Sequence, residues 1–217
     1  RRSFYAPLLI WMGGLVVRIL DTGQRVLPQR EWEQRERLIY QTVYGASIQV
    51  EADGTLVLPF LEGQTLAALL EDRTLDEVVR NQAIERAVVA LSEFHQAGFT
   101  HADAMAENVL VDSRVAHWFD FETIHDPSRS MVWRRGDDVR ALLSTCLIRT
   151  APAKRSETVQ LILGSYTDEG VARVVASSFT SVWRRSLAFH LAQAALSFQS
   201  FHEIGRLLRE RRQVVHQ

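Results

Sequence analysis

The side chains in this sequence that could do chemistry together gather between Phe99 and Glu122. The stretch reads FTHADAMAENVLVDSRVAHWFDFE and contains His101, Asp103, Asn108 and Asp120. Asn108 follows Asp103 by five positions, and Asp120 follows it by 17. A carboxylate can take a proton from a hydroxyl group, and carboxylate and amide oxygens are ligands that Mg²⁺ prefers. The chemistry open to this set is therefore proton transfer close to a bound divalent cation.

Regular elements on both sides of this stretch are expected to hold it in place. Residues 76–97 carry apolar side chains at helical spacing and are followed by a glycine, which is typical of a helix end. Residues 108–112 (NVLVD) and 115–121 (VAHWFDF) indicate two short strands with a tight turn between them. Asp103 is then expected in a loop between helix and hairpin, and Asp120 at the end of the hairpin.

In this context the stretch resembles the catalytic segment of the protein-kinase-like superfamily. Its loop reads H-x-D-x-x-x-x-N, and its metal-binding aspartate begins a D-F-G or D-F-D/E motif. The resemblance implies an ATP-dependent phosphotransferase that moves the γ-phosphate of ATP to a hydroxyl group, with Mg²⁺ as cofactor. Asp103 would be its catalytic base and His101 would support the loop. Asn108 and Asp120 would hold the Mg²⁺ ion.

The run LVLPFLEGQTL, residues 56–66, is similar to the family's fifth strand, hinge and following helix. Backbone groups of Pro59, Phe60 and Leu61 would then contact the adenine of ATP. An ordinary strand that leaves a sheet would give the same pattern, so this alternative stays open.

Asp138, in GDDVRALL, resembles the buried aspartate that begins the central helix of the large lobe and supports the catalytic loop. A plain helix N-cap is the alternative for this residue, and the two roles can coexist. Ala102 replaces the arginine of the H-R-D form, and only 18 positions separate Asp120 from Asp138, which leaves little room for an activation segment. Over residues 15–147 the chain therefore resembles small-molecule, lipopolysaccharide or atypical kinases more than regulated Ser/Thr kinases.

The phosphate-binding residues of the family are the weakest part of the resemblance. No glycine-rich phosphate loop is recognisable, and the family's lysine is missing because Lys154, the only lysine, lies in the helical part. Arg18 is the best substitute, with Glu36 as its expected ion-pair partner. A solvent-facing Arg18, or an alignment through Arg25 or Arg30, stays open.

The composition favours one folded domain of the α+β class. Of 217 residues, 47% are hydrophobic and 24% charged, with 11 Gly and 5 Pro, which excludes a disordered or low-complexity chain. We expect a two-lobed protein-kinase-like fold, with a reduced β-rich lobe at residues 1–58, a hinge at 59–63 and a helical lobe at 64–217. The small lobe is expected to contain strands at 8–11, 15–20, 46–51 and 55–60 and a helix at 30–44. Further helices are expected at 66–70 and 138–147, and from residue 157 onward.

Two other functions remain open. A catalytically weak pseudokinase, acting as a binding or scaffold module, is favoured by the missing lysine and glycine-rich loop. The joint presence of Asp103, Asn108 and Asp120 argues against it. A metal-dependent hydrolase is the second alternative, since several side chains could ligate Zn²⁺ or iron. Its candidate ligands are His95, His101, Asp103, His117, Asp120 and His125.

The charge and the cysteine count limit partners and location. With 25 basic and 26 acidic residues the net charge is −1, so no nucleic acid is expected, only a nucleotide and an unidentified hydroxyl acceptor. Cys146 is the only cysteine, which favours a reducing compartment. Residues 6–17 lack the cleavage pattern of a signal peptide, and residues 186–202 are too polar for a membrane span, so the expected location is cytoplasmic. The apolar-striped residues 182–208 are expected either to pack in the core or to contact a protein or an anionic lipid.

Overall fold

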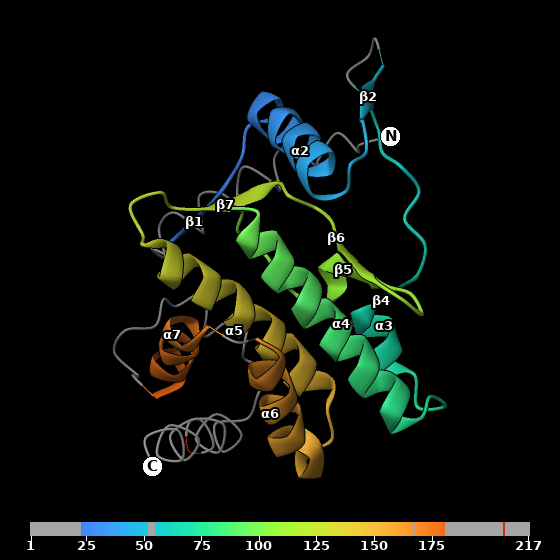
Figure 1. The fold of residues 1–217 in the computed structure, drawn as a ribbon, viewed down its shortest axis with the longest axis vertical. Coiled ribbons are helices and arrows are strands. Elements are labelled where there is room, and N and C mark those ends of the chain that lie inside the picture. The colour runs from blue at the N-terminus through green and yellow to red at the C-terminus, as the bar shows by residue number, and fades with distance from the viewer. Residues whose placement is uncertain (1–22, 52–54, 167, 181–205, 207–217) are drawn as a thin grey trace, which may run out of the picture.

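The computed structural model describes residues 23–51, 55–166 and 168–180, together with Arg206. Within these residues the chain is a mixed α+β protein in which helices predominate and the sheets are small and antiparallel (Figure 1). The α+β class expected from the sequence is therefore confirmed. The strands expected at 8–11 and 15–20, Arg18, and the helix expected at 182–208 lie outside the described residues, apart from Arg206.

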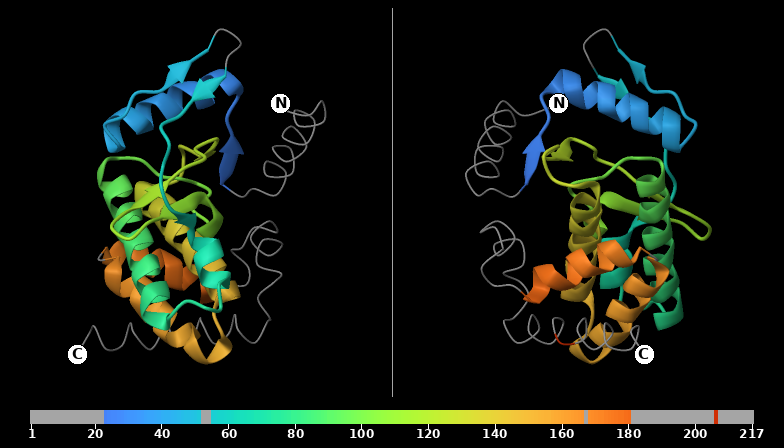
Figure 2. Two further views of the ribbon diagram at one scale, coloured as in Figure 1. Left: turned by 90° about the vertical axis from the view of Figure 1, so that its right-hand side faces the viewer. Right: turned by 60° about the vertical axis from the view of Figure 1, so that its left-hand side comes forward.

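Six α-helices and two 3₁₀ turns are described. The helices are α2 (Gln29–Val43), α3 (Leu66–Glu71), α4 (Glu77–Gln96), α5 (Met131–Arg149), α6 (Arg155–Ser165) and α7 (Glu169–Thr180). The 3₁₀ turns are η1 (Ala106–Asn108) and η2 (Pro152–Lys154). Helices α4 and α5 run side by side, with α6 against both and α7 against α5, while α2 and the β2 strand lie at the opposite end of the molecule (Figures 1 and 2).

The strands form three separate antiparallel sheets. They pair as β1 (Gln24–Val26) with β7 (Thr123–His125), β2 (Gln49–Val50) with β3 (Leu56–Val57), and β4 (Gln64–Thr65), β5 (Val109–Val111) and β6 (Ala116–Trp118) in that order. The β5–β6 hairpin confirms the strands expected at 108–112 and 115–121, but β6 ends at Trp118 and leaves Asp120 outside the strand. Gly63 begins the approach of β4 to β5 with a φ of +119°, and a Cβ there would lie 2.7 Å from the Val111 carbonyl oxygen. Only glycine fits this close passage.

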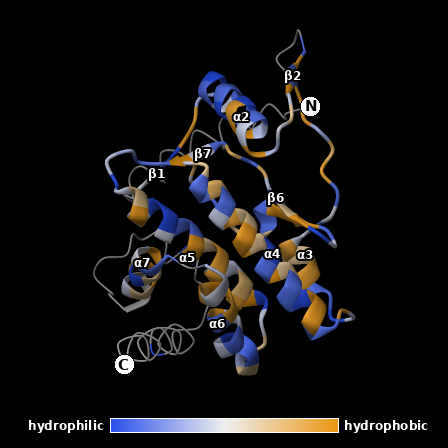
Figure 3. Ribbon diagram, in the orientation of Figure 1, coloured by the Kyte–Doolittle hydropathy of each residue, from blue (hydrophilic) through white to orange (hydrophobic). Residues whose placement is uncertain are grey.

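The hairpin rests on helix α4 because both present apolar side chains to the same core. Helix α4 buries the apolar positions expected from the sequence, and its two faces differ in hydropathy in Figure 3. The Phe94 and Phe121 rings stack with centroids 5.3 Å apart, and Trp118 Nε1 donates to the Ala87 carbonyl oxygen at 3.3 Å. These contacts fix the end of the hairpin, and with it Asp120, against the helix that precedes the His101 loop.

Helix α5 begins seven residues earlier than the sequence predicts. Ser130 caps it by accepting a hydrogen bond from the Trp133 backbone N–H at 3.2 Å, and Met131 is its first residue. Asp138 therefore lies in the middle of the helix, fully buried, and both the expected start of the helix there and the N-cap alternative are wrong. The residues before Asp138 belong to the helix as well, and Asp137 and Asp138 are both buried with polar partners.

Candidate functional site

The loop that contains His101 and Asp103 is held by a single buried carboxylate from α5. Asp138 Oδ2 accepts a hydrogen bond from the His101 backbone N–H at 2.8 Å, and Asp138 Oδ1 accepts one from Ala102 at 2.7 Å. Ala102 has a φ of +68°, a left-handed conformation that is uncommon outside glycine. The two charge-assisted bonds stabilise this turn, which presents the next residue, Asp103.

Asp138 is itself held by two histidines and is ionised. His95 Nε2 lies 2.9 Å from Asp138 Oδ2, and His95 Nδ1 lies 2.7 Å from the Tyr166 hydroxyl oxygen. Burial alone raises the pKa of the Asp138 carboxyl, but the attraction of His125 and His95 lowers it overall, to about 2. The loop is therefore anchored on a fixed negative charge.

His101 joins the loop to the end of the hairpin. Its Nδ1 accepts a hydrogen bond from the Asp103 backbone N–H at 3.3 Å, so the ring proton is on Nε2, which donates to the Phe119 carbonyl oxygen at 2.9 Å. The side chain is fully buried, and burial lowers its pKa to about 4. A neutral imidazole thus links Asp103 to the residue before Asp120.

Asp103 and Asn108 are direct neighbours. Asn108 Nδ2 donates to the Asp103 carboxylate oxygen Oδ2 at 2.8 Å and to the Asp103 carbonyl oxygen at 2.9 Å. Two acceptors on one nitrogen fix the orientation of the amide and leave the oxygen, Oδ1, as the atom able to bind a cation. Burial raises the pKa of Asp103 to about 6, the Asn108 bond lowers it, and the charges of Asp120 and Glu122 raise it further.

Asp120 stands at the end of the hairpin with its side chain exposed. Its φ of +66° turns the chain two residues after β6 and just before the buried Phe121. Its pKa is raised, chiefly because the surrounding protein removes water from it, while a backbone hydrogen bond from Glu122 lowers it. The charge of Asp120 is one of the causes that raise the pKa of Asp103, so the two carboxylates lie within electrostatic range of each other.

Glu36, on α2, adds a third carboxylate and is almost fully buried. It accepts a backbone hydrogen bond from Phe121, yet its Oε2 has no hydrogen-bond partner among the described residues. Burial raises its pKa to about 7, and the negative charge of Asp120 adds to this shift. The expected partner, Arg18, lies outside the described residues, so the expected Arg18–Glu36 pair stays a prediction.

The donor set fits Mg²⁺ bound together with nucleotide phosphates. In the described part of the chain no group of three or more His, Cys, Asp or Glu side chains is arranged to hold a metal. Magnesium in nucleotide sites takes only one or two protein oxygens and completes its shell with phosphates and water. The Asn108 Oδ1 atom and the exposed Asp120 carboxylate are oxygens of this kind, and the mutual repulsion of the acidic groups favours a divalent cation.

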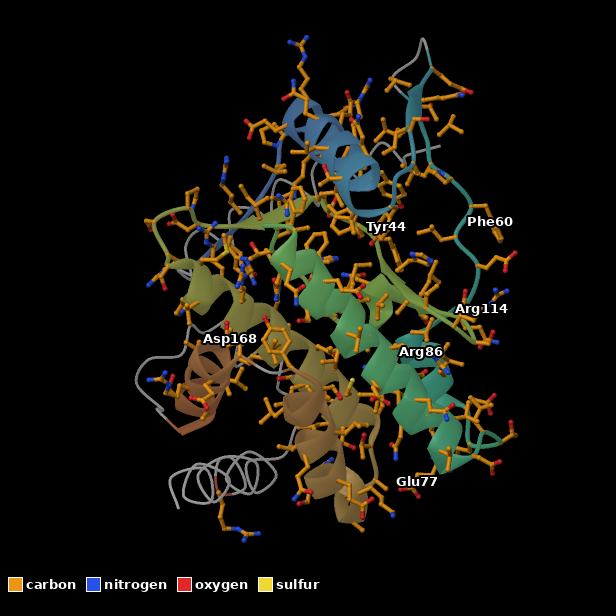
Figure 4. All side chains as sticks on the ribbon, viewed as in Figure 1. Tyr44, Phe60, Glu77, Arg86, Arg114 and Asp168 are labelled. Atoms are coloured by element: carbon orange, nitrogen blue, oxygen red, sulfur yellow. The ribbon has the colours of Figure 1, made fainter. Side chains whose placement is uncertain are left out.

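The segment expected to contact adenine is the extended connection between β3 and β4. Phe60 is 89% exposed and lies on the outer side of this connection, away from the helices (Figure 4). Pro59 is half-buried, and Leu61 packs against the core. The expectation concerned backbone groups of these residues, and it stays a prediction.

The histidines of the hydrolase alternative have other roles. Both ring nitrogens of His95 and of His125 lie within hydrogen-bond distance of protein oxygens, and His117 packs its ring edge against Tyr44 at 5.3 Å. With their nitrogens occupied, His95 and His125 offer no lone pair to a metal. Two of the six candidate ligands of the hydrolase alternative are thus engaged in other contacts, whereas His117 Nδ1 has no hydrogen-bond partner among the described residues.

Arg35, Thr100 and Asp137 take part in the hydrogen bonds around the loop, although nothing in the sequence singled them out. Asp137 directly precedes Asp138 and accepts hydrogen bonds from Gln24 and Arg140. The position of Asp137 in the same GDD run as Asp138 was the one feature of the sequence that could have pointed to it. Arg35 lies in a strongly charged helical segment, where any arginine is expected to face solvent.

Comparison with known proteins gives no family assignment: neither a protein-family model nor a curated protein matches the sequence. Across the described residues, no helix has the length and apolarity needed to cross a membrane. The functional argument therefore depends on the geometry of the Asp103 site.

Proposed function

We propose that this protein is an ATP-dependent phosphotransferase of the protein-kinase-like type, acting on a hydroxyl group of a small molecule, glycan, lipid or protein. One arrangement carries the proposal. A loop fixed by the buried Asp138 presents Asp103, bonded to Asn108, beside the exposed Asp120 at the end of a hairpin. These residues supply the kinds of group that phosphoryl transfer needs, a carboxylate to act as base and two oxygens to bind Mg²⁺, and this supports the proposal.

The arrangement of the elements supports the two-lobed fold in this proposal. Helix α2 and the β2–β3 hairpin lie at one end, and an extended connection over residues 58–63 leads to the helices at the other (Figure 1). The proposed small lobe is residues 1–58, the hinge 59–63 and the helical lobe 64–217. Nucleotide in such a fold would bind between the two lobes, beside the hinge.

In the proposed reaction, bound Mg·ATP supplies the phosphoryl group and the positive charge that offsets its oxygens. The acceptor oxygen forms a bond to the γ-phosphorus, the bond to the bridging oxygen of ADP breaks, and the hydroxyl proton passes to an Asp103 carboxylate oxygen. Asn108 Nδ2 orients that carboxylate, and its Oδ1 together with Asp120 would hold Mg²⁺. Asp138 and His101 keep the loop still while the charges change.

Turnover tests the proposal. Purified protein is incubated with Mg·ATP and a panel of hydroxyl acceptors, and ADP formation is measured for the wild type and for Asp103→Asn. Loss of a general base lowers the rate by about 10²–10⁴-fold. Asp103→Asn is therefore expected to lose turnover but to bind ATP as the wild type does. The matched control is Asp76→Asn, an exposed aspartate at the start of α4, which is expected to behave as the wild type.

The pseudokinase alternative is distinguished by the same experiment. The missing small-lobe lysine favours it, since in the kinase family that cation normally binds the α- and β-phosphates of ATP. ATP binding without ADP formation for any acceptor, unchanged by Asp103→Asn, would replace the phosphotransferase with a nucleotide-binding scaffold.

A further inference from the structure

Arg35 is a half-buried cation with one hydrogen bond among the described residues. Its Nη2 donates to the Thr100 carbonyl oxygen at 2.6 Å, across 65 residues of sequence. Its Nε atom is buried and has no partner among the described residues. Burial lowers the pKa of the guanidinium, and the carboxylates of Asp138 and Glu36 oppose that shift. A half-buried cation with one hydrogen bond contributes little to stability, because the loss of hydration offsets much of the gain from the bond.

The acceptor of this bond directly precedes the catalytic loop. Thr100 is followed by His101 and Ala102, whose backbone N–H groups bind Asp138. The Thr100 hydroxyl oxygen also lies 3.1 Å from His125 Nδ1. A shift of Thr100 would therefore move both the loop that presents Asp103 and strand β7, which contains His125.

The network extends from Thr100 to β1 through a second buried aspartate. His125 Nε2 lies 3.2 Å from Asp137 Oδ2, and Gln24 Nε2, on β1, donates to the same oxygen at 2.9 Å. Arg140 pairs with the other oxygen, Asp137 Oδ1. Consecutive aspartates of α5 thus fix the two sides of the site: Asp138 the catalytic loop, and Asp137 the β1–β7 pair.

On the other side of Arg35, the same helix contacts the second half of the site. Glu36 accepts the backbone N–H of Phe121, the residue after Asp120. Two neighbouring residues of α2 therefore bind the two halves of the site: Arg35 binds the loop that presents Asp103, and Glu36 binds the segment that contains Asp120. Ala102, where related loops have an arginine, leaves the loop without a cation of its own.

From this geometry we infer that Arg35 is a positioning residue, which couples the placement of α2 to that of Asp103 through the Thr100 carbonyl. Movement of α2 would then displace the base and the Asp120–Phe121 segment together, so that both halves of the site assemble in one step. The inference rests on the proposed phosphotransfer for its catalytic meaning, but the mechanical coupling can be measured without nucleotide.

The test compares three substitutions on one helix. Arg35→Met removes the bond and keeps the volume, Arg35→Lys keeps a donor and a charge, and Arg37→Met is the matched control at an exposed position. Amide hydrogen exchange is measured without nucleotide at residues 101–103 and 121, together with the thermal midpoint. With Mg·ATP and an acceptor, kcat and KM for ATP are measured separately.

We expect Arg35→Met to speed exchange at residues 101–103 by about tenfold or more and to lower kcat by about 10²-fold, since misplacement of a reacting group by about 1 Å has effects of that size. KM for ATP is expected to change less than threefold. Arg35→Lys should recover a large part of kcat, and Arg37→Met should match the wild type throughout.

Each alternative result has a definite meaning. If a folded Arg35→Met protein exchanges residues 101–103 at the same rate as the wild type, the coupling is overturned, whatever its activity is. Equal losses in Arg35→Lys and Arg35→Met, proportional to lost thermal stability, reduce Arg35 to a structural residue and also overturn it. If Arg35→Met fails to fold, Thr100→Val, which keeps the carbonyl bond but removes the His125 contact, should raise exchange in β7 more than at Ala102, and the reverse order contradicts the inference. If Arg35→Met speeds exchange at residues 101–103 but the wild type shows no turnover with any acceptor, the coupling is supported and the phosphotransferase is refuted.

Discussion

At the scale of single residues, the site depends on buried polar groups whose partners fix their charge. Asp138 is ionised because its oxygens accept hydrogen bonds from His101 and Ala102 and face His95. His101 is neutral because one nitrogen must accept from Asp103. Such groups are costly to bury singly, and they are stable here only as a set. A change at one of them should therefore appear in the pH dependence of the whole protein.

Replacement of His101 tests this directly. Its pKa is about 4 in the folded protein, lowered by burial, against about 6.5 when unfolded. Above pH 6.5 both states are neutral. As the pH falls from 6.5 to 4, only the unfolded state takes up the proton, so the free energy of unfolding falls, by up to ~3 kcal/mol from this group.

Denaturant unfolding between pH 4 and pH 7.5 is the measurement for this prediction. His101→Gln is expected to be less stable than the wild type at pH 7 and to show a smaller fall below pH 6.5. His125, whose pKa burial also lowers, adds to the fall, while Glu36 and Asp103, whose pKa values are raised, oppose it in both proteins, so the difference between the two proteins reports on His101. His117→Gln, at a partly exposed position on the hairpin, is the control. An undiminished fall in His101→Gln would mean that His101 is charged in the folded protein.

At the scale of elements, α5 is the helix that organises the site, and its packing on α7 depends on a glycine. A Cβ at Gly136 would lie 2.7 Å from Val174 Cβ on α7. Gly136 immediately precedes Asp137 and Asp138, so a displaced α5 would carry both aspartates with it. The close contact between α5 and α7 at Gly136 therefore keeps Asp137 and Asp138 buried in their observed positions.

Gly136→Ala is therefore expected to destabilise the protein by about 1–3 kcal/mol, the usual effect of overpacking. Gly164→Ala in α6 is the matched control, because a Cβ there meets nothing within 4 Å, and alanine in a helix adds about 0.5–1 kcal/mol of stability. Val174→Ala added to Gly136→Ala should restore part of the loss. Denaturation midpoints measure all three, and a neutral Gly136→Ala would show that the contact between α5 and α7 is loose.

Periodic elements were predictable from the sequence, and elements defined by distant partners were not. The helix expected at 76–97 is α4 at Glu77–Gln96, and the helix expected at 66–70 is α3 at Leu66–Glu71, because both carry regular apolar spacing. Strands β1, β4 and β7 have two or three residues each and exist only through long-range pairing. No local pattern identifies a strand of that kind.

The same distinction applies to the site. Asp103 and Asn108 could be singled out because they fit the H-x-D-x-x-x-x-N pattern, and the structure adds a hydrogen bond of 2.8 Å between them. Arg35 and Thr100 are 65 positions apart, and their bond uses a backbone carbonyl, which has no residue signature. The start of α5 was misplaced because buried aspartates look the same in sequence as exposed ones.

At the scale of the whole molecule, the part that contains β1 and α2 (Figure 2) is bonded to the segment that leads from β6 to β7 and contains Asp120. Leu27 donates its backbone N–H to the Glu122 carbonyl oxygen at 2.8 Å, and the Tyr44 hydroxyl donates to the Trp118 carbonyl oxygen at 2.6 Å. A ligand bound at the site should therefore stabilise both the part that contains β1 and α2 and the helical part. This is the behaviour expected of a nucleotide site that lies between two structural units.

Calorimetric titration of Mg·ATP into the purified protein tests the central claim, with Asp120→Asn as the comparison and Asp76→Asn as the matched control. The account predicts binding that requires Mg²⁺, is lost or weakened at least tenfold in Asp120→Asn, and is unchanged in Asp76→Asn. Asp120 is exposed, so its replacement leaves the core intact and the result reports on the site. Absence of binding up to millimolar Mg·ATP, or binding indifferent to both Mg²⁺ and Asp120, would contradict the proposed phosphotransferase.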